Sequence, residues 1–126
     1  MIRTIIICMV LFCSNLFADS TEKKLTESDV NNLIRCIESE NTGVRFWGVF
    51  FAGEYNVREA VLPLIKILQQ NNDEYIREIA VHSLYRIGDI RGLLAIREAA
   101  KYDNSDDVKK LCDTLVKQLN LSLNYP

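Results

Sequence analysis

Ile76-Arg77-Glu78-Ile79-Ala80 is the central copy of a pattern that recurs at a fixed interval along the chain. Val44-Arg45 lies one interval before it and Val108-Lys109 lies one interval after it, and each pair begins a helix-like apolar pattern. The agreement continues downstream, where a small side chain recurs at Gly48, Ala80 and Cys112. A fixed period of this length is typical of a stacked repeat array.

The apolar spacing between these motifs predicts six helices, because apolar residues three and four positions apart line one face of a helix. We expect the helices at residues 28–40, 44–54, 58–70, 74–87, 91–101 and 106–119. Thr26 and Asp29 resemble a capping box, and Gly88 suits the left-handed residue that often follows a helix. The recurrent small side chain fits a point where two helices cross closely.

The sequence therefore predicts an all-α fold, an α–α superhelix (solenoid) of three helical hairpins. No single hairpin can bury its own apolar face, and three is about the smallest number that can. In the first hairpin we expect the second helix to bury one set of side chains, namely Val44, Trp47, Gly48, Phe51, Ala52 and Tyr55.

These motifs resemble the HEAT repeat, in the short variety also found in phycobilisome lyase-like proteins. The middle unit carries the resemblance best, with Val61-Leu62-Pro63-Leu64-Ile65 in its first helix and Ile76-Arg77 opening its second. The resemblance covers residues 28–120, which we assign as the repeat domain. It implies a binding scaffold whose second helices line a concave surface.

The N-terminal segment, residues 1–18, differs from the rest of the chain. Arg3 is the only charged residue before Asp19, and an unbroken apolar run extends from Ile5 to Cys13. A basic start, a short apolar core and a closing small residue are typical of an export signal, and the run is too short to span a bilayer in the usual way. We expect residues 1–18 to be a signal peptide cleaved after Ala18, although an uncleaved anchor or acylation of Cys13 or Cys8 stays open.

After cleavage, the protein would be periplasmic or secreted, with no membrane span in the mature chain. Residues 19–27 would form an N-terminal extension and residues 121–126 a C-terminal tail. The chain has 126 residues, is 48% hydrophobic and carries a net charge of −2, values that suit one globular domain and give no nucleic-acid footprint.

We expect neither enzymatic activity nor a cofactor. His82 is the only histidine, so a metal site built on repeated histidines is not predicted. Cys36 and Cys112 lie two repeats apart, too far for a disulfide in a stacked array, and both occupy apolar helix positions.

The outward positions of the second helices form the predicted partner-binding surface. They combine an aromatic and apolar patch with a basic rim, and such exposed clusters often mark interaction sites. The candidate residues on this concave face are Phe46, Val49, Phe50, Val81, His82, Tyr85, Arg86 and Lys117. Alternatively, residues 19–27 or an end cap could cover Phe46 and Phe50.

The basic residue of each motif has a structural interpretation. Arg45, Arg77 and Lys109 can hydrogen-bond turn residues such as Glu40, Asn71 and Asp103, forming a ladder that ties the repeats together. The sequence thus favours an exported protein-binding or scaffolding module with an unidentified protein partner. The alternative is a non-catalytic accessory or lyase-like subunit that binds a small ligand, and a third possibility is self-association through the end faces.

Overall fold

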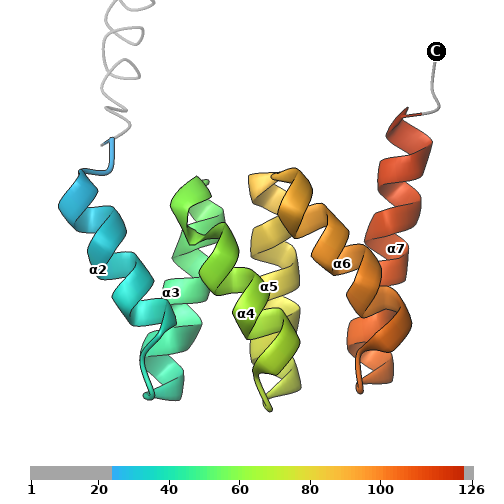
Figure 1. The fold of residues 1–126 in the computed structure, drawn as a ribbon, viewed down its shortest axis with the longest axis horizontal. Helices are drawn as coiled ribbons and strands as arrows, with labels where there is room; N and C mark the ends of the chain where they lie inside the picture. The colour runs from blue at the N-terminus through green and yellow to red at the C-terminus, as the bar shows by residue number, and fades with distance from the viewer. Residues whose placement is uncertain (1–23, 124–126) are drawn as a thin grey trace, which may run out of the picture.

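The structure, a computed structural model, describes residues 24–123, with side chains described to residue 120. Within that range it contains six α-helices and one short 3₁₀ helix, labelled as in Figure 1. Their bounds are α2 (Glu27–Ile37), α3 (Thr42–Glu54), η1 (Arg58–Ala60), α4 (Val61–Gln70), α5 (Glu74–Ile87), α6 (Ile90–Tyr102) and α7 (Asp106–Leu123). The predicted all-α fold is confirmed. The predicted signal peptide at residues 1–18 lies outside the described residues, as do residues 19–23 and 124–126.

The helices pair as hairpins, α2 with α3, α4 with α5 and α6 with α7, and the hairpins stack side by side. The second helices form one layer, because α5 contacts both α3 and α7, while the first helices form another, in which α4 contacts both α2 and α6. Figure 1 shows α4 and α6 in front of α3, α5 and α7. This arrangement is a short solenoid of three hairpins.

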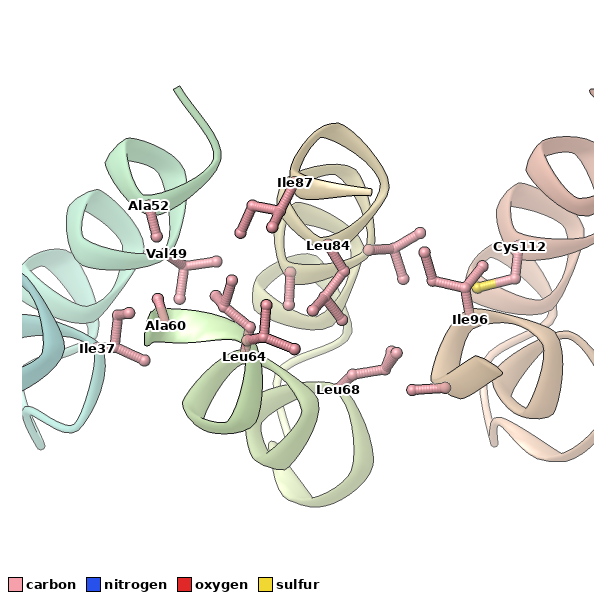
Figure 2. Close-up of a cluster of buried hydrophobic side chains, with 14 of the residues drawn as sticks. Ile37, Val49, Ala52, Ala60, Leu64, Leu68, Leu84, Ile87, Ile96 and Cys112 are labelled. Carbon is pink, nitrogen blue, oxygen red and sulfur yellow. The ribbon is translucent and has the colours of Figure 1, made fainter. Parts of the chain in front are cut away.

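The core runs between the two layers along the full length of the stack. Figure 2 shows it passing from Ile37 in the first hairpin, through Leu64 and Leu84 in the second, to Ile96 and Cys112 in the third. All five side chains are completely buried. Each hairpin therefore contributes to one shared apolar core that none could form alone.

Side-chain caps fix where the helices begin. Thr26 and Asp29 form the expected capping box at the start of α2, with the Thr26 hydroxyl accepting from the Asp29 backbone N–H. Asn41 and Asp73 cap α3 and α5 by accepting backbone N–H groups of the first helical turn. Gly88 follows α5 with φ 68°, the left-handed conformation that the sequence predicts.

The small-residue position is confirmed as a close helix crossing. At Gly48, an added Cβ would lie 2.6 Å from the Ile37 backbone nitrogen and 2.9 Å from Cys36 Cβ, so α3 touches the backbone of α2. Ala80 and Cys112, at the equivalent positions of the next two hairpins, are fully buried. Close packing at this point explains why a small side chain recurs there.

The first hairpin departs from the predicted burial pattern. Val44, Trp47 and Tyr55 were expected inside, but they are 42%, 55% and 57% exposed. Gly48 and Ala52 are buried as expected, and Val49 and Gly53 are buried with them. The expectation was wrong for Val44, Trp47 and Tyr55 because only hairpins that follow another hairpin have a neighbour against that side of their second helix. Helix bounds agree within about three residues, except that 58–70 begins as η1 and α7 continues to Leu123.

Candidate protein-binding surface

Aromatic side chains gather on α3. Phe46 stacks on Phe50 with ring centroids 6.4 Å apart, and on Tyr75 at the start of α5 with centroids 6.0 Å apart. Trp47 meets Phe46 edge to face at 5.1 Å. Parallel and edge-to-face contacts are the favourable arrangements for aromatic rings, so these rings hold one another in place.

The periodic pattern missed Tyr75 in this cluster. Tyr75 precedes the repeated Ile76-Arg77 motif, and its side chain is 57% exposed. It reaches Phe46 because α5 packs directly against α3. Only the relative placement of two hairpins reveals this neighbour, since the two residues belong to different repeats and are distant along the chain.

The outward side of α5 continues the surface. His82 is exposed at the position equivalent to Phe50, and Arg86 is at the position equivalent to Glu54. Arg86 Nη1 donates to Glu54 Oε1, joining two successive hairpins across their outer side. We define the second-helix face by the outward residues Phe46, Phe50, Glu54, His82 and Arg86.

Two of the predicted binding residues lie elsewhere. Val49 and Val81 are 0% exposed, so both are core residues, and their outward placement was wrong. The following hairpin approaches α3 closely at Val49, whose backbone carbonyl accepts a 2.8 Å hydrogen bond from Ser83 Oγ. Tyr85 is half-buried and packs against the core.

Lys117 is exposed, but it does not join the aromatic cluster. Its Nζ donates to Asp113 Oδ2 over 2.6 Å on α7, two hairpins away from α3. The predicted basic rim is also largely neutralised, because Arg86 and Lys117 each form an ion pair with a carboxylate, Arg86 with Glu54 and Lys117 with Asp113. The surface is therefore more aromatic and less basic than the sequence pattern indicated.

The predicted ladder residues form one strong connection between hairpins. Arg77 donates to both carboxylate oxygens of Asp103 and to the backbone carbonyls of Asn71 and Asn72. Arg77 and Asp103 are both largely buried, with side chains 10% and 6% exposed. The hydrogen bond to Asp103 raises the pKa of Arg77, so the guanidinium stays charged.

The other two ladder positions act within their own hairpins. Arg45 Nε donates to the Ser39 carbonyl, 2.9 Å away, just as Arg77 bonds the carbonyl six residues before it. Lys109 pairs with Asp106, one turn of helix away, and not with Asp103. The position equivalent to Asp103 in the middle hairpin is Asn71, which offers Arg45 no carboxylate. The missing carboxylate at that position explains why Arg45 forms no equivalent of the Arg77–Asp103 pair. Among the described residues, that pair is the only ion pair of a ladder residue that spans two hairpins.

A groove lies between the turn ends of the second and third hairpins. Its volume is about 630 Å³, and Arg77, Asp103, Gln69, Glu98 and Tyr102 are among its lining residues. The Arg77 guanidinium in its lining already donates hydrogen bonds to Asp103 and to two carbonyl oxygens. The groove thus offers a polar recess without an unpaired buried charge in its wall.

Groups that could perform chemistry are sparse in the described part of the chain. Burial raises the pKa of the Cys112 thiol to about 12, so it is a poor nucleophile, and Cys36 is half-buried. Residues 24–123 contain no group of three or more histidine, cysteine or carboxylate side chains placed to hold a metal ion. Over the same range no helix has the length and apolarity needed to cross a membrane.

Comparison with known proteins identifies the repeat. A family model described as HEAT repeats matches residues 30–115, a range that reaches into all three hairpins. No curated protein matches the sequence.

Proposed function

The chain belongs to the HEAT repeat family, and from this membership we propose that it is a non-catalytic scaffold that binds a protein partner through its second-helix face. HEAT arrays generally present such surfaces to other proteins, and in this family the second helices line the concave side. The observation that carries the proposal is the stacked aromatic cluster of Phe46, Phe50 and Tyr75, which joins the second helices of two hairpins.

The chemistry of the cluster suits protein recognition. Phe46 and Phe50 are half-buried, so their rings are held by neighbours while their outer parts remain accessible. Rigid aromatic rings lose little entropy on binding and are enriched among residues that dominate interface energies. The Glu54–Arg86 pair beside them supplies a polar border of the kind that surrounds such clusters.

We propose that the protein acts outside the cytoplasm, in the cell envelope or beyond it. The support is the sequence of residues 1–18, with its basic start, apolar run and closing Ala18. Mass spectrometry of the native N-terminus tests this part separately, since a mature chain that begins at Asp19 is expected and a chain that retains residues 1–18 would contradict cleavage.

The binding proposal is tested by comparative capture from envelope extract. Phe46→Ala and Phe50→Ala are expected to reduce recovery of a specific partner at least about tenfold, the loss typical of a central aromatic contact. Leu62→Ala is the matched control, because Leu62 is 60% exposed but lies on α4 in the other layer. Equal recovery with all three variants would reject the second-helix face as the binding surface.

A small ligand is the second candidate, favoured by the groove of about 630 Å³ beside Arg77 and Asp103. In this alternative the chain is an accessory subunit of the phycobilisome lyase-like variety of HEAT protein. A soluble ligand that binds the folded state raises the unfolding temperature as its concentration increases. Such a rise, abolished by Glu98→Ala in the groove wall and unaffected by Phe50→Ala, would favour the ligand over the protein partner.

A further inference from the structure

One end of the stack exposes side chains whose equivalents in the other two hairpins are more deeply buried. Val44 is 42% exposed, whereas its equivalents Ile76 and Val108 are 2% and 0% exposed. Tyr55 is 57% exposed, whereas its equivalent Ile87 is 5% exposed. We call the surface of Val44, Trp47, Phe51 and Tyr55 on α3 the end face.

The end face is the side on which a preceding hairpin would pack. Ser83 is the equivalent of Phe51 in the second hairpin, and it contacts α3 directly by donating to the Val49 carbonyl. An added Cβ on Gly53 of α3 would lie 2.7 Å from Ser83 Cα, so the contact is close. The end face is therefore the surface of α3 on which the next interface in the series α3, α5 and α7 would form. No described residue covers it.

The opposite end of the stack has the chemistry of a true terminus. Asp113 on α7 stands where α3 and α5 have the buried Val49 and Val81, and it forms an exposed ion pair with Lys117. Repeat arrays need such polar outer surfaces on their terminal units to stay soluble. The end face has no such charged residue in place of an apolar one. Instead, aromatic rings contact one another in a row from Phe46 through Phe51 to Tyr55.

Removal of residues 1–18 is part of the proposed export, and this inference rests on it. Once they are removed, the rest of the chain supplies little to cover these rings. The remaining segment before α2 is Asp19-Ser20-Thr21-Glu22-Lys23-Lys24-Leu25-Thr26, in which Leu25 is the only apolar residue. Leu25 is already partly buried against the core. The occupant of the end face must then come from another molecule.

We propose that a second copy of this chain covers the end face, with two copies packed through the same surface around a two-fold axis. A head-to-tail contact is disfavoured, because it would place the exposed charges of Asp113 and Lys117 against the rings of Trp47 and Phe51. The symmetric contact places aromatic surface against aromatic surface and closes after two copies, leaving no apolar end.

The available area sets the expected strength. A buried aromatic side chain covers roughly 150–250 Å², and Trp47 and Tyr55 are each a little over half exposed. The four end-face residues can therefore bury a few hundred Å² per copy, which is less than the roughly 800 Å² per partner of a standard-size protein interface. The dimer should therefore be weak, and it should form and dissociate reversibly as concentration changes.

Trp47 provides a direct probe, because it is the only tryptophan in the chain and lies at the centre of the end face. The chain from Asp19 and the full chain are each measured by sedimentation and by intrinsic fluorescence from micromolar to millimolar concentrations. For the chain from Asp19 we expect mass to rise toward that of a dimer with concentration, while Trp47 emission shifts to shorter wavelength in step.

Val44→Lys and Tyr55→Lys test the surface while preserving the probe. Each substitution enters a two-fold interface twice, so the dissociation constant should rise more than tenfold and the concentration-dependent emission shift should disappear. Both positions are exposed, and unchanged circular dichroism verifies that the variants fold. Tyr102→Ser is the control: Tyr102 is 77% exposed on α6, and its loss should leave the dimer intact.

Three outcomes would overturn the proposal. The first is a chain from Asp19 that stays monomeric throughout, and the second is a dimer that Val44→Lys and Tyr55→Lys leave unchanged. The third is a monomeric full chain whose Trp47 emission is already shifted, which would show that residues 1–18 cover the end face. The mature N-terminus and the capture experiment read out export and partner binding independently of these results.

Discussion

Arg77 and Asp103 join the second hairpin to the third through a two-pronged ion pair, with guanidinium Nε and Nη2 lying 3.0 and 2.8 Å from the two carboxylate oxygens. Arg77 also holds the α4–α5 turn through the carbonyls of Asn71 and Asn72. Asp103 Oδ1 in turn accepts the Ser105 backbone N–H at the start of α7. One ion pair thus fixes two turns that would otherwise be connected only by the core.

We expect Asp103→Asn to lower the free energy of unfolding by about 2–3 kcal/mol, because it leaves the largely buried Arg77 without its counter-charge. Urea denaturation followed by circular dichroism measures the change. Asp106→Asn is the control, since Asp106 is 96% exposed and its pair with Lys109 should contribute less than about 1 kcal/mol. Similar losses for both variants would contradict the structural role of the buried pair.

The same pair should make stability depend on acid pH. Burial raises the pKa of Asp103, but the hydrogen bond from Arg77, together with the other favourable interactions of the carboxylate, outweighs it, so the pKa lies below its ordinary value. A lowered folded-state pKa gives stability that is complete above the unfolded value of about 3.9 and is lost as pH falls through the folded pKa. The difference between wild type and Asp103→Asn should be constant from neutral pH to about pH 5 and shrink below about pH 4. A difference that grows on acidification would contradict this sign.

Two glycines of α3 should respond in opposite ways to alanine. Gly48→Ala places a Cβ 2.6 Å from the Ile37 backbone nitrogen, so α2 and α3 must separate, at a cost of about 1–3 kcal/mol. Gly43→Ala meets only Asn41 Oδ1 at 3.4 Å, and the better helix propensity of alanine should leave stability unchanged or raise it by up to about 1 kcal/mol. Thermal unfolding of both variants measures the contrast. Equal behaviour would mean that α2 does not approach α3 as closely as the structure shows.

The two cysteines of the chain from Asp19 should differ in reactivity. Burial raises the pKa of Cys112 to about 12, which leaves almost no thiolate at pH 8, whereas Cys36 is half-buried. Under native conditions a maleimide should modify Cys36 first and Cys112 only as the chain unfolds. Peptide mapping after timed labelling separates the two sites. Modification of Cys112 at the rate of Cys36 in the absence of denaturant would contradict its burial.

The periodic pattern predicted the fold because it records local requirements that each hairpin must satisfy. A small residue must recur where helices cross, as Gly48, Ala80 and Cys112 do, and helix starts need caps such as Thr26. The pattern could not show which positions face a neighbouring hairpin. It therefore led to the expectation that Trp47 and Tyr55 are buried and that Val49 and Val81 are exposed, and the structure shows the reverse.

The sequence by itself determined the number of helices, their pairing as hairpins and the basic residue at the start of each second helix, because these follow from spacing along one chain. Only the tertiary structure decided that Arg77 reaches Asp103, that Phe46 stacks on Tyr75 and that α3 turns an aromatic face outward. The physical reason is that each of these features depends on the hairpin that lies beside it, and a repeat at the end of a stack has a neighbour on only one side.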